Sequence, residues 1–210
     1  RERSEWLWGW DETPGIVSVW AEPDGRALVW RRLPGTLDLV REEAQFRPWM
    51  LLASLRDLRH LGGRLRPEAD GPAPGRVTYR ELSGPGELRF VVSAESGRSL
   101  TTAVLQGASR RLERQLRSVR ELGAGEALSL PPEEQYLVAS GRTYFKGLFF
   151  DDLRRMQFDL ETTGLDPEAG RVFLAAARDP EGHVHLLEAA DGGDAAESEL
   201  IRRLCETVRA

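Results

Sequence analysis

The protein is a chain of 210 residues with a formal net charge of −5, a length that suits one large domain or two small ones. Its hydrophobic content of 40% is that of a folded protein, and the lack of any apolar run long enough to cross a bilayer argues against a membrane protein. The mild acidity argues against a wholly basic coat for nucleic acid, and the single cysteine, Cys205, fits a reducing, cytoplasmic compartment. The chain begins with Arg1 and not with an initiator Met, so we expect it to come from within a longer chain. Its start lacks an extended apolar core and a small-residue cleavage site and is therefore not that of a signal peptide.

The first part of the chain is predicted to be rich in short strands. Residues 15–33 hold two alternating runs around Asp24-Gly25, a dipeptide typical of a hairpin turn, and Ala27 and Val29 share one face of the second run. Further short elements are expected in the following order: a strand in 46–54, a helix in 54–63, a loop in 66–75 and a second hairpin in 76–94.

The longest helical pattern runs over residues 98–122. Apolar residues recur there at spacings of three and four, while arginines fall largely off the apolar stripe. Such arginines are typical of a solvated helix face, and a surface that faces phosphates is the alternative. The stripe comprises Leu100, Val104, Ala108, Leu112, Leu116 and Val119, and the arginines are Arg110, Arg111, Arg114, Arg117 and Arg120.

The last third of the chain predicts a short helix and then a compact group of strands. Pro131 and Pro132 suit the first turn of the helix and Gly141 suits its end. Three strands are expected in 155–162, 171–179 and 182–190, and an amphipathic helix in 194–210 with Asp194 as its N-cap.

Two carboxylates on the first of these strands are candidate metal ligands. Side chains alternate along a strand, so Asp159 and Glu161 point to the same side, while Phe158 and Leu160 are expected to point into packing. Paired carboxylates repel unless a cation lies between them, and Mg²⁺ and Mn²⁺ prefer such oxygen ligands. The alternative is the polar end of an ordinary strand, because Asp-x-Glu is a short pattern.

Two other groups of residues allow a functional interpretation. His183 and His185 alternate on one strand like a pair of zinc ligands, although an ordinary hairpin edge without a third ligand is favoured. Trp6, Trp8 and Trp10 alternate near the start and are able to stack on bases, although burial against the first sheet is favoured.

Two motifs carry a resemblance to a known family. The stretch "FDLETTGL", residues 158–165, resembles the first motif of the DEDD-type 3′–5′ exonucleases, which have an RNase H-like fold. The stretch "EEQYLVASG", residues 133–141, and the strand-rich region before it are similar to the N-terminal part of family B DNA polymerases. The resemblance covers nearly the whole chain, and these two motifs are its specific part.

The resemblance implies an α+β or α/β architecture in three parts: a mixed, strand-rich module over 1–130, a connecting helix and linker over 131–155, and the first three strands and first helix of an RNase H-like domain over 156–210. It also implies a DNA polymerase with proofreading activity, a nucleoid-associated location, and partners that include single-stranded 3′ ends, primer-template DNA and deoxynucleotides. Asp159 and Glu161 would hold Mg²⁺ or Mn²⁺ as catalytic ligands. Thr162 would lie beside the 3′-terminal nucleotide, and Leu165 would pack on its base.

The family uses further carboxylates as ligands, and no residue of this chain can be assigned to these roles. Two ligands from one strand cannot hold two ions firmly, so we predict that these 210 residues alone degrade no DNA and that the first strand of the half-domain has an open edge. Two other interpretations remain: a non-catalytic nucleic-acid-binding protein built on an RNase H-like half-domain, and a nuclease completed by a partner chain.

Overall fold

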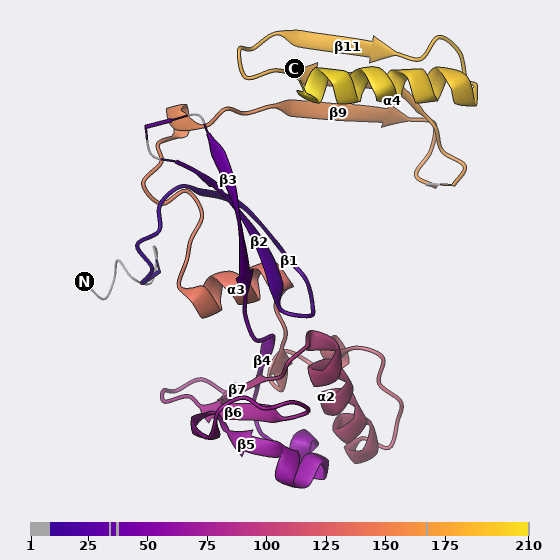
Figure 1. Ribbon diagram of the computed structural model, residues 1–210. Coiled ribbons are helices and arrows are strands. Elements are labelled where there is room, and N and C mark those ends of the chain that lie inside the picture. The colour runs from indigo at the N-terminus through magenta and orange to yellow at the C-terminus, as the bar shows by residue number, and fades with distance from the viewer. Residues whose placement is uncertain (1–8, 34, 37, 167, 210) are drawn as a thin grey trace. The chain divides into compact units, whose positions relative to one another are not determined.

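The computed structural model describes residues 9–33, 35–36, 38–166 and 168–209. The chain forms two compact units, Arg1–Leu148 and Phe149–Ala210. Strands and helices occur in both units (Figure 1), which confirms the predicted mixed fold of α and β elements.

The first unit begins with a three-stranded antiparallel sheet in the order β1–β2–β3. Its strands are β1 (Ile16–Ala21), β2 (Arg26–Arg32) and β3 (Leu39–Gln45). The predicted hairpin joins β1 to β2, and Ala27 and Val29 are fully buried on its inner face as expected. Helix α3 (Pro132–Ser140) covers that face through Tyr136, which packs in the same apolar cluster. The side chains that alternate with these inner residues along the strands lie on the opposite face of the sheet.

Strand β3 was absent from the predicted elements. Its burial alternates strictly along the strand, and Glu42 lies on the inner, half-buried side. Arg31 of β2 forms an ion pair with Glu42 at 2.7 Å, and Arg142, far along the chain, forms another at 3.4 Å. A charged side chain therefore occupies an inward position at which a strand that covers an apolar core normally has an apolar residue. The position tolerates Glu42 because the two arginines neutralise its charge.

The second sheet of the first unit has five strands in the order β5–β6–β7–β4–β8 and packs on helix α2 (Gly97–Arg111). The predicted apolar strand forms at β4, and the second predicted hairpin forms from β6 and β7. The predicted helix of 54–63 is the 3₁₀ segment η1, in which Gly62 has a positive φ of 53°. The strands are β4 (Trp49–Leu52), β5 (Leu65–Pro67), β6 (Val77–Glu81), β7 (Phe90–Ser93) and β8 (Ala127–Leu128), and the 3₁₀ segments are η1 (Arg56–Arg64), η2 (Glu68–Asp70) and η3 (Val119–Leu122).

The long helix predicted over 98–122 ends early, at Arg111. Glu113 adopts a left-handed φ of 51°, which an α-helix cannot continue through, and a loop follows. Leu116 is buried from that loop and Val119 from η3, so both contribute to the core without being helical. The apolar spacing of the sequence therefore continues beyond the helix that it predicted.

One arginine of this region is not part of a solvated face. Arg111 makes two hydrogen bonds to the buried Asp57, Nε to Oδ1 at 2.8 Å and Nη2 to Oδ2 at 3.0 Å. Its Nη2 also donates to Glu126 Oε2 at 2.7 Å. Arg111 thus ties the end of α2 to η1, and the interpretation as a solvated residue is wrong for it.

The segment after α3 packs against the start of the described chain. Gly141 ends α3 with a φ of 71°, and the ring of Trp10 lies where a Cβ at Gly141 would be. Asp11 N–H donates to the Gly141 carbonyl at 3.1 Å, and Lys146 Nζ donates to the Asp11 carbonyl at 2.7 Å. Residues up to Leu148 therefore belong to the first unit. Trp10 is 62% exposed, so its predicted burial is wrong, and Trp6 and Trp8 lie outside the described residues.

The second unit is an antiparallel three-stranded sheet with one helix, in the order β11–β10–β9. Ala175, Leu187 and Leu200 form its small apolar core between the sheet and the helix. The three predicted strands and the predicted last helix are all present. Its elements are η4 (Phe150–Asp152), β9 (Gln157–Thr162), β10 (Val172–Arg178), β11 (Val184–Glu188) and α4 (Asp194–Arg209).

Among the residues that the structure describes, no helix combines the length and the apolar character that a membrane span requires.

Candidate metal site

The two candidate ligands lie on β9, at the edge of the second unit's sheet. In the ladder with β10, Asp159 pairs with Ala176 and Glu161 pairs with Leu174. Both partners face away from α4, because the residues between them, such as the fully buried Ala175, contribute to the core on the helix side. Asp159 and Glu161 therefore share the face of the sheet that α4 does not cover, with Cα atoms about 7 Å apart.

Both carboxylates are exposed and lack a cationic partner. Neither forms an ion pair with any residue that the structure describes, and Asp159 Oδ1 accepts one hydrogen bond, from the Leu160 backbone at 3.0 Å. Burial against arginines would have ruled out a cation between them. Two unneutralised carboxylates on one open face are instead available to a divalent ion.

The apolar residues that alternate with them do not point into packing, and the prediction is wrong on this point. Phe158 is 63% exposed and Leu160 is 39% exposed. They lie on the helix side of β9, opposite the buried Ala177 and Ala175, but α4 packs on β10 and β11. In the described part of this unit, both faces of β9 and its free edge are thus uncovered (Figure 1). An open edge of this strand is what the sequence predicted.

The two predicted substrate-binding residues lie where β9 leaves the sheet. Thr162 is exposed, and its Oγ1 donates to the Gly164 carbonyl at 2.8 Å. Leu165 is fully exposed in the loop that connects β9 to β10. Both side chains follow the two carboxylates along the chain and are exposed.

An ion pair that the sequence did not reveal holds the base of this loop. Thr163 N–H donates to the Arg171 carbonyl at 2.9 Å, and the Arg171 backbone N–H donates to Thr163 Oγ1 at 2.9 Å. The Arg171 guanidinium pairs with Glu197 at 3.3 Å and with Asp194, both in the first turn of α4. The Val172 N–H also donates to Glu197 Oε1, at 2.7 Å. The loop after the carboxylates is therefore fastened to the helix that supports β10.

The two histidines lie in the β10–β11 hairpin and share a single carboxylate. His183 Nδ1 lies 3.1 Å from Asp179 Oδ2, and His185 Nε2 lies 3.2 Å from the same oxygen. Burial raises the pKa of Asp179, but the His183 backbone N–H and the two imidazoles outweigh it and lower the pKa to about 2. This arrangement stabilises the turn, in agreement with the favoured interpretation of an ordinary hairpin.

The donor set on β9 fits one side of a magnesium or manganese site but does not complete it. Asp159 and Glu161 supply hard oxygen ligands on an open face. No group of three or more side chains of the ligating types is placed to hold an ion anywhere in the described ranges of the chain. A two-ion site here therefore requires ligands in addition to these two.

No model of a known protein family matches the chain, and none of the curated proteins does. Among solved structures, the chain is similar to the family B DNA polymerase from the hyperthermophilic archaeon Pyrobaculum calidifontis, with a TM-score of 0.51 and 14% sequence identity over 93% of this chain. The chain spans 28% of the length of that polymerase. At this identity the likeness is one of fold, and it includes both units.

Proposed function

We propose that this chain is the N-terminal part of a family B-like DNA polymerase and carries the first two ligands of its 3′–5′ proofreading exonuclease. The observation that carries the proposal is the position of Asp159 and Glu161, side by side on the open face of an edge strand. The fold likeness to a solved family B polymerase supports the assignment to this class of enzyme. Polymerisation itself would require residues outside this chain.

The residues of β9 and its loop have separate roles in this proposal. Asp159 and Glu161 would each contribute carboxylate oxygens to Mg²⁺ or Mn²⁺. Two such ions, when bound, activate a water molecule and stabilise the leaving oxygen of a phosphodiester. Thr162 would contact the 3′-terminal nucleotide, and Leu165, which is fully exposed, would pack on its base. The Arg171–Glu197 pair would keep the loop in position for both contacts.

The first test measures metal binding by the 210-residue chain. Mn²⁺ titrated into the protein and followed by electron paramagnetic resonance should bind weakly, and Asp159→Asn or Glu161→Gln should remove that binding. Glu188→Gln is the matched control, because Glu188 lies on the same face of the sheet two strands away, about 10 Å from β9. Mn²⁺ binding that is equal in all three variants would contradict the assignment of the ligands.

The second test measures nuclease activity. The 210-residue chain should leave single-stranded DNA intact in Mn²⁺, because its ligand set is incomplete. In the full gene product, Asp159→Asn should abolish removal of a mispaired 3′ end and leave nucleotide addition unchanged. Retained exonuclease in that variant would refute the catalytic role. DNA affinity and biological role that are both unchanged in Asp159→Ala would favour the non-catalytic alternative.

A further inference from the structure

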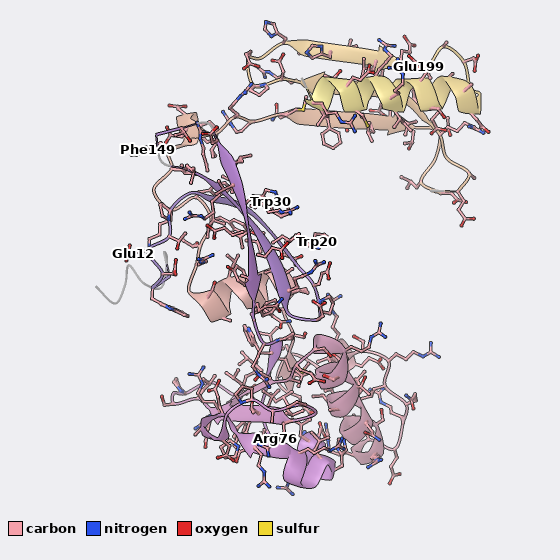
Figure 2. All side chains as sticks on the ribbon, viewed as in Figure 1. Glu12, Trp20, Trp30, Arg76, Phe149 and Glu199 are labelled. Atoms are coloured by element: carbon pink, nitrogen blue, oxygen red, sulfur yellow. The ribbon has the colours of Figure 1, made fainter. Side chains whose placement is uncertain are left out.

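The outer face of the β1–β2–β3 sheet is uncovered in the described part of the first unit. Helix α3 packs on the inner face, and Figure 2 shows the labelled side chains of Trp20 and Trp30 on the side of the sheet away from α3. Trp20 is 56% exposed and Trp30 is partly exposed. We call this surface the tryptophan face and define it by Trp20, Arg26, Leu28, Trp30, Arg32 and Arg41.

The register of the hairpin places the two tryptophans on the same face of adjacent strands. Trp20 pairs with Leu28, and Trp30 pairs with Ser18, so the tryptophans occupy diagonal positions on adjacent strands. Diagonal neighbours on one face of an antiparallel pair lie about 7 to 8 Å apart, within reach of large aromatic side chains. Two aromatic rings at this spacing, rising from a sheet, form a platform on which successive unpaired bases can stack.

Arginines surround the two rings. Arg41 of β3 lies directly opposite Trp30, is exposed, and forms no ion pair with any residue in the described ranges. Arg32, on the same strand as Trp30, uses its Nε to donate to the Thr36 carbonyl at 3.0 Å. Arg26 pairs with Glu22, and Glu43 of β3 lies on this face opposite Leu28, so two acids stand beside the three arginines. The tryptophan face therefore carries a small excess of positive charge, although the chain as a whole is acidic.

We propose that the tryptophan face binds single-stranded DNA, with Trp20 and Trp30 stacked on bases and Arg41 contacting a phosphate. An apolar partner surface would match the rings but would not balance the arginines, which outnumber the acids on this face, whereas the DNA backbone supplies counter-charges. A duplex does not expose the faces of its bases along its length, so the rings favour a single strand. This inference rests on the proposed function, which supplies DNA as the ligand, but it concerns a surface of the first unit, and Asp159 and Glu161 belong to the second.

The test uses the purified 210-residue chain and a fluorescein-labelled 20-mer of thymidylate, with binding followed by fluorescence anisotropy. Trp20→Ala and Trp30→Ala should each weaken binding about tenfold, within the range expected for loss of one base–aromatic stack. Trp20→Phe should keep most of the affinity because it keeps a ring. Arg41→Glu should weaken binding and reduce its dependence on salt concentration.

Trp10→Ala is the matched control, because Trp10 is also an exposed tryptophan of the first unit, at 62%, but lies over Gly141 rather than on this face. It should bind as the unmodified protein does. Thermal melting by circular dichroism establishes that each variant is folded. If a tryptophan variant does not fold, Arg41→Glu, a change at an exposed side chain, tests the proposal in its place.

Three results would overturn the proposal. The first is affinity that is unchanged in Trp20→Ala and Trp30→Ala, and the second is no binding of the 20-mer by the unmodified protein. The third is a dimer that Trp20→Ala converts to a monomer, which would make the tryptophan face an interface between copies. None of these results depends on the metal site. The tests with Asp159→Asn decide the proposed function separately.

Discussion

The substitution Arg111→Ala should destabilise the first unit strongly, although Arg111 lies at the end of a helix where arginines are usually solvated. The carboxylate of Asp57, 7% exposed, receives two hydrogen bonds from the Arg111 guanidinium at 2.8 and 3.0 Å. These bonds come first among the causes that raise the pKa of Arg111. The substitution would leave Asp57 buried without its cation.

The magnitude follows from the burial of the pair. Removing one partner of a buried ion pair costs about 3 to 5 kcal/mol, and since the Arg111 side chain is 25% exposed, we expect the lower end, about 3 kcal/mol. For a unit of this size, that loss corresponds to a melting temperature about 6 to 12 °C lower. Replacing both partners, in Asp57→Ala with Arg111→Ala, should cost less than the sum of the single changes, because no unpaired charge remains.

Tryptophan fluorescence during guanidinium unfolding is the assay, because all six tryptophans precede residue 50 and therefore report on the first unit alone. Arg114→Ala is the control: Arg114 pairs with Glu121 at 3.2 Å on the surface, so its loss should cost less than about 1 kcal/mol. If Arg111→Ala changed the free energy of unfolding no more than Arg114→Ala does, the buried pair would not stabilise the unit.

Two further predictions concern packing and pH. Gly107→Ala should lower the melting temperature, although a change from Gly to Ala within a helix usually adds about 1 kcal/mol of stability. The reason is that the new Cβ would lie 1.7 Å from the Asp57 carbonyl oxygen of η1. The control is Thr102→Ala, at an exposed position of the same helix, which should not lower the melting temperature. Asp179 has a pKa lowered to about 2, so its stabilisation of the hairpin is fully present above its ordinary pKa of 3.8 and is lost as the pH falls through 2. Its carboxyl carbon, followed by NMR, should titrate with a midpoint near 2, and a midpoint at 3.8 or above would show that the contacts to His183 do not form.

The elements that the sequence predicted well are those specified by neighbours along the chain. The β1–β2 hairpin follows from strict alternation around Asp24-Gly25, and Gly25 does adopt a positive φ of 89°. Helix α3 ends at Gly141, again with positive φ, as its glycine indicated. Turn residues and period-two alternation act within a few positions, so a single sequence displays them directly.

The elements that the sequence did not predict depend on distant partners. Strand β3 is stabilised by an inward Glu42 whose second cation, Arg142, lies 100 residues away. Helix α2 ends where Arg111 reaches Asp57, 54 residues earlier in the chain. Neither partner can be identified from local spacing, because many arginines and acids are present and only the fold decides which of them meet.

The residues of the candidate site also fall into those that local spacing predicts and those that depend on distant partners. Asp159 and Glu161 were identified because two carboxylates at a spacing of two on a strand must share a face, and the register of β9 with β10 agrees. The anchor of the neighbouring loop, Arg171 with Glu197, was not identified, since it joins residues 26 positions apart across a strand and a helix.

The openness of β9 explains how two carboxylates of this chain could serve in a larger site. Because α4 packs on β10 and β11, Phe158 and Leu160 are left exposed on one face of β9 while Asp159 and Glu161 occupy the other. A further strand that paired with the free edge of β9 would have side chains about 5 Å from both carboxylates, close enough to share a cation with them. The same pairing would allow an additional helix to cover Phe158 and Leu160. Under the proposed function, a neighbouring segment that extended this sheet beyond β9 would both add ligands and cover the exposed apolar residues.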